Sequence, residues 1–319
     1  MPILNRAAEM QEEVAGWRRH LHQTPELNFD VFQTAAFVTD KLQAFGCDEV
    51  VTGLGKTGVV GIIRGRKGEG PAIGLRADMD ALPINEITGK PYASSVPGKM
   101  HACGHDGHTA MLLGAAKLLA EEGGFDGTVR FIFQPAEEWG RGALAMIEDG
   151  LIERFPFEEI FGLHNMPGLP IGHFETRSGP IMSAEDNFEI VLKGLGGHAA
   201  RPHDARETLI AACALVVNLQ TIVSRRLSPV DIGVVSVTEL ITDGTRNALP
   251  GLARILGDCR SFRPEVSAAI EKEMRLIAEG TAQAYNVAAE VTYTREFVPL
   301  INDAALVNEA LAAARTVLA

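Results

Sequence analysis

Residues 128–138 read Thr-Val-Arg-Phe-Ile-Phe-Gln-Pro-Ala-Glu-Glu, an apolar stretch that ends in two adjacent glutamates. Residues 72–80, Ala-Ile-Gly-Leu-Arg-Ala-Asp-Met-Asp, repeat this pattern with two aspartates, and residues 162–165, Gly-Leu-His-Asn, contain a histidine. Short β-rich runs of this kind predict strands. Because open α/β sheets bind ligands outside the carboxyl ends of their strands, we expect these side chains to converge on one sheet edge.

Working outward, the first part of the chain alternates predicted helices and strands. The helical spacing of apolar residues predicts helices over residues 7–23, 31–45 and 109–122. The β-rich runs predict strands over residues 58–63, 72–75, 128–133 and 160–163. This alternation is typical of an α/β domain.

The pattern changes after residues 179–180, Gly-Pro. The elements expected beyond them are a strand over 188–192, a helix over 207–225, strands over 231–240 and 254–260, a helix over 266–285 and a strand over 288–293. This order, β-α-β-β-α-β, predicts a second compact unit with a ferredoxin-like arrangement. A last, alanine-rich helix is expected over residues 303–319.

Composition excludes several classes of protein. The formal net charge is −12 for 319 residues, and no basic patch offsets it, so the phosphate backbone of a nucleic acid would be repelled. The longest apolar run, residues 209–217, is too short to span a bilayer. Four separated cysteines and a charged N-terminus without an apolar leader indicate a cytoplasmic protein with free thiols.

The chemistry concentrates in four segments. Residues 101–108, His-Ala-Cys-Gly-His-Asp-Gly-His, precede the predicted helix and join the three strand ends. Each donor alone has an ordinary interpretation: Cys103 as a buried hydrophobe, Asp106 as a helix cap, Glu137-Glu138 as a solvated pair and His164 as a core histidine. Together they predict a metal site.

The mixture of ligand types narrows the choice of metal ion. Thiolate and imidazole ligands with a carboxylate suit Zn²⁺, Mn²⁺, Co²⁺ or Ni²⁺ better than Mg²⁺ or Ca²⁺, which prefer oxygen ligands. Two successive glutamates can divide the work, one binding metal while its neighbour takes a proton from water. The sequence therefore predicts hydrolysis of a carbonyl compound.

The motifs resemble those of the M20 metallopeptidase family, and most closely its amidohydrolase branch, which includes hippurate hydrolases, N-acyl-amino-acid amidohydrolases and plant auxin-conjugate hydrolases. The segments that carry the resemblance are 17–27 (Trp-Arg-Arg-His-Leu-His-Gln-Thr-Pro-Glu-Leu), 76–83 (Arg-Ala-Asp-Met-Asp-Ala-Leu-Pro), 101–109, 134–138, 163–165 and 196–203 (Gly-Gly-His-Ala-Ala-Arg-Pro-His). The likeness implies an α/β fold, with a mixed-sheet, zinc-peptidase-like catalytic domain and an inserted ferredoxin-like α+β lid or dimerisation domain.

Metal and base roles follow from the resemblance by position. The residues that match ligands of a two-metal centre are Cys103, His105, Glu138 and His164. Glu137 matches the general base. Asp80 matches an aspartate that orients a ligand, and is expected in that supporting role. The implied cofactors are two divalent transition-metal ions.

The predicted lid contributes further residues by the same resemblance. His198 matches a histidine that helps to bind the substrate carboxylate or the developing oxyanion, and Asn247 matches a substrate-binding element in part. Arg260 is a weaker carboxylate-binding candidate, with a salt bridge as the equal alternative. The likeness also implies a homodimer formed through the lid. The other histidines are expected to be structural or solvated: His20, His22, His101, His108, His173 and His203.

These inferences predict a catalytic domain of residues 1–183 and 294–319, and a lid of residues 184–293. Family members continue with a later histidine ligand that nothing here matches, so we expect an incomplete C-terminal part. The predicted activity is metal-dependent hydrolysis of linear amides, non-peptide C–N bonds, in small N-acyl amino acids such as hippurate. Two alternatives remain: a dipeptidase or aminopeptidase of the same family, and a catalytically dead metal-binding or dimerising relative.

Overall fold

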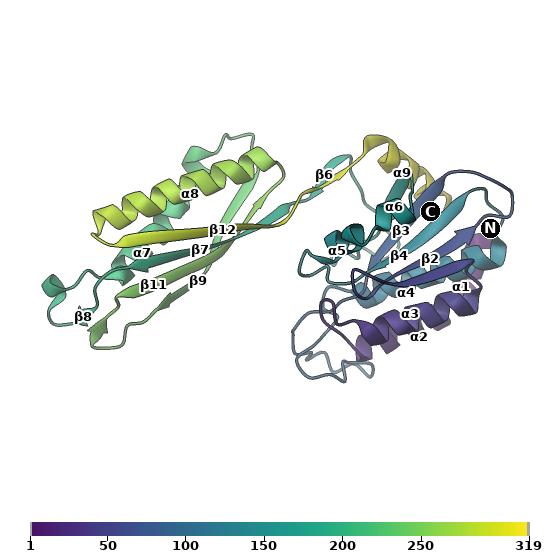
Figure 1. Cartoon of the computed structure of the whole chain (residues 1–319), viewed down its shortest axis with the longest axis horizontal. Helices are drawn as coiled ribbons and strands as arrows, with labels where there is room; N and C mark the ends of the chain where they lie inside the picture. Colours follow the sequence, from purple (N-terminus) through teal and green to yellow (C-terminus); the bar gives the residue numbers. More distant parts are fainter. Residues whose placement is uncertain (1, 318–319) are drawn as a thin grey trace. The chain divides into compact units, whose positions relative to one another are not determined.

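The computed structural model describes residues 2–317, and the side chains from residue 5 onward. Contacts within the chain divide these residues into two compact units, 2–173 with 317 and 174–316. Figure 1 labels most of the helices and strands of both units. Every helix in the described part of the chain is too short or too polar to cross a membrane.

A five-stranded sheet with the order β1-β2-β4-β3-β5 forms the centre of the first unit. β3 (Ala72–Asp78) runs parallel to both of its neighbours, β4 (Thr128–Gln134) and β5 (Glu159–Gly162). β2 (Gly58–Arg64) is antiparallel to β4, and β1 (Glu49–Leu54) is antiparallel to β2. The sheet is therefore mixed, which confirms the predicted fold class.

Alternation along the strands sorts side chains onto two faces, each covered by helices. Phe131 and Phe133 belong to one apolar cluster with Trp17, whereas Ile132 belongs to a second cluster with Met146. The helices of this unit are α1 (Pro2–Glu9), α2 (Gln11–Gln23), α3 (Phe32–Phe45), α4 (His105–Glu122), α5 (Gly142–Glu148) and α6 (Leu151–Arg154). The sheet thus has a hydrophobic core on both sides.

Two predicted helices have different limits in the structure. The helix expected over 7–23 is interrupted at Met10, which separates α1 from α2. The helix expected from residue 109 begins at His105, directly after Gly104 in a left-handed conformation with φ of 92°. Apolar periodicity missed this first turn because its residues, His-Asp-Gly-His, are polar or small although three of them are buried.

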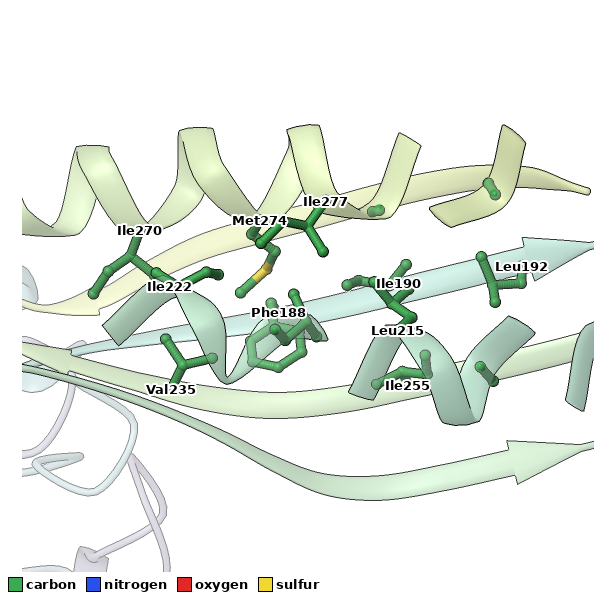
Figure 2. Packing of buried hydrophobic residues seen from close by; sticks show 14 of the residues in the cluster. Phe188, Ile190, Leu192, Leu215, Ile222, Val235, Ile255, Ile270, Met274 and Ile277 are labelled. Atoms are coloured by element: carbon green, nitrogen blue, oxygen red, sulfur yellow. The ribbon is translucent and has the colours of Figure 1, made fainter. Parts of the chain in front are cut away.

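The second unit contains an antiparallel sheet with the order β12-β7-β11-β9. Its elements are β7 (Ala184–Lys193), α7 (Thr208–Leu219), β9 (Gly233–Thr242), β11 (Leu252–Ser261), α8 (Pro264–Ala284) and β12 (Ala288–Phe297). Their chain order confirms the predicted β-α-β-β-α-β arrangement. Figure 2 shows Phe188, Ile190 and Leu192 of β7 packed with Leu215 of α7 and Met274 of α8, so both helices share one apolar core with the sheet.

Short elements complete the described chain. They are β6 (Gly179–Met182), β8 (Gly197–His198), a 3₁₀ helix (Pro202–Asp204), a π-helical turn (Ile222–Arg226), β10 (Ala248–Leu249), β13 (Leu300–Asn302) and α9 (Ala304–Val317). Because β6 pairs with β13, residues 174–183 and 294–316 fall in the second unit rather than with the first. Assignment of residues 294–319 to a catalytic domain stays a prediction, and residues 318–319 lie outside the described range.

Candidate metal centre

The candidate centre lies at the carboxyl edge of the three parallel strands. Asp78 ends β3, and Asp80 follows it by two residues. Glu137 and Glu138 follow β4, and His164 follows β5. Since β3 is parallel to both of the other strands, the three strands end at the same sheet edge, as the sequence predicted.

Asp80 positions the two glutamates through their backbone. Its fully buried carboxylate accepts hydrogen bonds from the Glu137 N–H at 2.9 Å and from the Glu138 N–H at 3.2 Å. The preceding residue, Ala136, has a φ of 48°, a left-handed conformation that is costly for a residue with a Cβ. This turn directs both amides toward Asp80, and a role of Asp80 in orienting a metal ligand stays a prediction.

Cysteine, histidine and glutamate side chains come together here. Cys103 Sγ lies 3.5 Å from His164 Nε2. His105 Nε2 lies 3.8 Å from a carboxylate oxygen of Glu137 and 3.8 Å from Oε1 of Glu138. Candidate ligand atoms of Cys103, His105 and His164 lie within 4.8 Å of one another, and the same holds for His105, Glu137 and Glu138.

Buried polar atoms without partners test whether these residues fit a metal. His105 is 1% exposed, yet neither of its ring nitrogens makes a hydrogen bond, and Oε1 of Glu138 is buried without a partner as well. Buried polar groups are nearly always satisfied, so unpaired ones need an explanation. A cation between these donors would satisfy them, and the residues therefore fit a metal.

The electrostatics agree with a cation site. Burial alone lowers the pKa of His105, but its contacts with Asp80 and Cys103 outweigh burial and raise that pKa to about 11. Burial raises the pKa of Glu137, and the Asp78 carboxylate adds to this effect. The contacts with His105 and His164 lower the pKa of Cys103. These shifts show a concentration of negative charge that favours binding of positive charge.

Two residues given no catalytic part by the sequence are built into this edge. His108, 3% exposed, bonds Asp78 through Nδ1 at 2.7 Å. Arg76 pairs with the other Asp78 oxygen at 2.7 Å. Burial raises the pKa of Asp78, but His108 and Arg76 outweigh it and hold that pKa well below its usual range. The i, i+3 spacing of His105 and His108 was the sequence feature that could have indicated a place for His108 beside the site.

The candidate substrate residues lie in the second unit. His198 in β8 pairs with Ala248 in β10, and the Ala199 N–H donates to the Asn247 carbonyl at 3.0 Å, so this two-stranded ribbon brings His198 and Asn247 together. Both side chains are exposed. Arg260 instead pairs with Glu185 at 2.8 Å and Asp258 at 2.9 Å. Its guanidinium is engaged by two carboxylates, and substrate binding by Arg260 stays a prediction.

The fold and the donor cluster are those of a metal-dependent hydrolase. The chain belongs to peptidase family M20/M25/M40, whose sequence model matches residues 74–319. It is similar to the N-acetyl-L-cysteine deacetylase of Bacillus subtilis strain 168, with 43% identity over 93% of this chain and 71% of the relative. It is also similar to the hippurate hydrolase of Campylobacter jejuni, with 42% identity over 91% of this chain and 75% of the relative.

The fold has solved counterparts. A dinuclear metal binding peptidase of the M20 family from Bacillus subtilis is 37% identical, with a TM-score of 0.80 over 97% of this chain and 80% of that chain. These comparisons confirm the family and the class of hydrolase that the sequence motifs indicated.

Proposed function

We propose that this protein is a metal-dependent amidohydrolase that removes the acyl group from small N-acyl amino acids. The unpaired, buried donor atoms of His105 and Glu138 at the sheet edge carry this proposal. The chain is similar to an N-acetyl-L-cysteine deacetylase, a hippurate hydrolase and an N-acyl-L-amino acid amidohydrolase, which supports the substrate class.

Four residues would hold the cofactor, which we propose to be two divalent transition-metal ions. They are Cys103, His105, Glu138 and His164. The similarity to a dinuclear metal binding peptidase supports the number of ions. Sulfur and imidazole donors favour Zn²⁺, Mn²⁺, Co²⁺ or Ni²⁺. Such an ion, when bound, acidifies water and polarises a carbonyl oxygen.

Glu137 has the position of a general base. Its backbone is fixed by Asp80, and its carboxylate lies beside His105. Burial keeps its pKa above that of an exposed glutamate, which makes the carboxylate a better proton acceptor. We propose that Glu137 takes a proton from the attacking water and then delivers it to the leaving amide nitrogen, so that the acid and the amine are released.

A substrate panel tests this function against its alternatives. Purified protein with added Mn²⁺, Co²⁺ or Zn²⁺ is assayed with hippurate and N-acetyl-cysteine. The comparison substrates are dipeptides that end in glycine or cysteine and have a free amino terminus. We expect kcat/KM to favour the acylated compounds because the matched lid motifs supply no evident anionic partner for a free amino terminus. A preference for dipeptides would support a peptidase, and no turnover of either set would support an inactive relative.

We propose that the protein forms a homodimer through its second unit. α7 is apolar along most of its length, yet three of its residues, Ile210, Cys213 and Val217, are exposed rather than buried in the core. β9 lies at the edge of its sheet, and an exposed edge strand is open to pairing with another chain. Sedimentation at micromolar concentration is expected to show a dimer, and a monomer alone would contradict this proposal.

We further propose a cytoplasmic location, because a metal-binding thiol must stay reduced and all four cysteines are free in the structure.

A further inference from the structure

The ring of His108 lies between two of the proposed ligands. His108 is one turn after His105 on α4, and the two rings stack with centroids 5.4 Å apart. The His108 ring also contacts the ring of His164 edge-on, with centroids 4.5 Å apart. A side chain that touches both histidines is placed to control their separation.

The hydrogen bonds of His108 determine which nitrogen carries its proton. Nδ1 lies 2.7 Å from the Asp78 carboxylate, which only accepts, and Nε2 lies 3.0 Å from the backbone N–H of Asn165, which only donates. Both bonds form together only when Nδ1 is protonated and Nε2 carries the lone pair. His108 lies close enough to Asp78 and His105 to form a metal-binding group with them. Because both of its ring nitrogens make hydrogen bonds, however, neither is free to bind a metal.

The chain of contacts continues from His108 to His164. Asn165, whose N–H His108 binds, accepts at its carbonyl a hydrogen bond of 2.6 Å from Nδ1 of His164. That bond leaves Nε2 of His164 facing Cys103 Sγ. The Asn165 side chain also lies against Gly104, where an added Cβ would be 2.3 Å from Oδ1. The two loops that carry Cys103 and His164 therefore meet at Asn165.

We infer that Asp78 and His108 are positioning residues that fix the orientation of His164 through the backbone of Asn165. This inference rests on the proposed function, since it assigns a purpose to His164 as a ligand. Partners of this kind orient ligand histidines, and their loss commonly costs about 10–100-fold in metal affinity or activity. Arg76 extends the chain of contacts by holding the second oxygen of Asp78.

The first test measures the tautomer directly and needs no metal. Long-range ¹⁵N–¹H correlation spectra of the metal-free, ¹⁵N-histidine-labelled protein distinguish protonated from unprotonated ring nitrogens, and His108→Gln assigns the signal by its disappearance. We expect a neutral His108 ring with the proton on Nδ1. A proton on Nε2 would place two donors face to face at Asn165 and would overturn the inference.

The second test compares two substitutions of His108, each of which keeps a different one of its two hydrogen bonds. The amide of asparagine can replace Nδ1 and keep the Asp78 contact, whereas the amide of glutamine can place an acceptor near the Nε2 position. Competition with a chelator then gives the Co²⁺ dissociation constant of each variant, with circular dichroism as the check on folding. We expect His108→Asn, which loses the Asn165 link, to weaken binding about 10–100-fold, and His108→Gln, which loses only the Asp78 link, to weaken binding less than His108→Asn.

Equal affinity of His108→Asn and the wild type would overturn the inference. Should the wild-type protein bind no metal, the proposed function fails, but the tautomer measurement still tests the contacts from Asp78 to Asn165. Failure of the inference and failure of the function therefore give different results.

Discussion

Replacing Glu137 with glutamine is expected to lower kcat by at least about 10²-fold, the usual effect of losing a general base. Glutamine has nearly the same shape, and the backbone N–H that binds Asp80 is unchanged, so the loop should keep its position. Only the ability to accept a proton is removed. Steady-state kinetics with elemental analysis of bound metal would show low turnover at normal metal content.

The neighbouring glutamate provides the matched control. Glu138→Gln keeps the backbone contact with Asp80 but removes the charge from a carboxylate whose buried Oε1 is unpartnered. We expect that variant to lose metal, and to lose activity through that loss. The reverse result, with normal metal in Glu138→Gln and depleted metal in Glu137→Gln, would exchange the two roles.

Complete removal of metal is expected to abolish hydrolysis. The candidate ligand atoms lie close together at a site rich in carboxylates, and the proposed mechanism needs a bound metal ion to acidify the water from which Glu137 takes a proton. After exhaustive chelation, Mn²⁺, Co²⁺ or Zn²⁺ should restore the rate, whereas Mg²⁺ should not, because it prefers oxygen ligands to sulfur and imidazole. Full activity in protein shown to be metal-free would contradict the mechanism.

Much of the fold was predictable because it depends on patterns of burial. The alternation around Phe131, Ile132 and Phe133 reflects a sheet with a core on each face, and the run was therefore readable as a strand. The second unit was predictable because burial alternates along β7 and β11, and because α8 is long and amphipathic. β1 was missed because its residues are mostly half-buried or exposed, which leaves no strong apolar signal.

The sequence did not predict those features in which polar residues are buried to form the site rather than to pack the core. His105, Asp106 and His108 begin α4, but their polarity concealed the helix. The convergence of Cys103, Glu138 and His164 could be expected because parallel strands end at one edge. The contacts of His108 with Asp78 and Asn165 could not, since they depend on backbone positions in the loop after β5.

The most direct test of the account is a Co²⁺ titration of the metal-free protein under anaerobic conditions, followed by absorption spectroscopy. If Cys103 is a ligand, a sulfur-to-cobalt charge-transfer band should appear and saturate. The band should be lost in Cys103→Ser and kept in Cys213→Ser, which changes an exposed thiol outside the site. Saturable binding with this pattern is the predicted result. Absence of binding, or a band that persists in Cys103→Ser, would contradict the proposed metal centre.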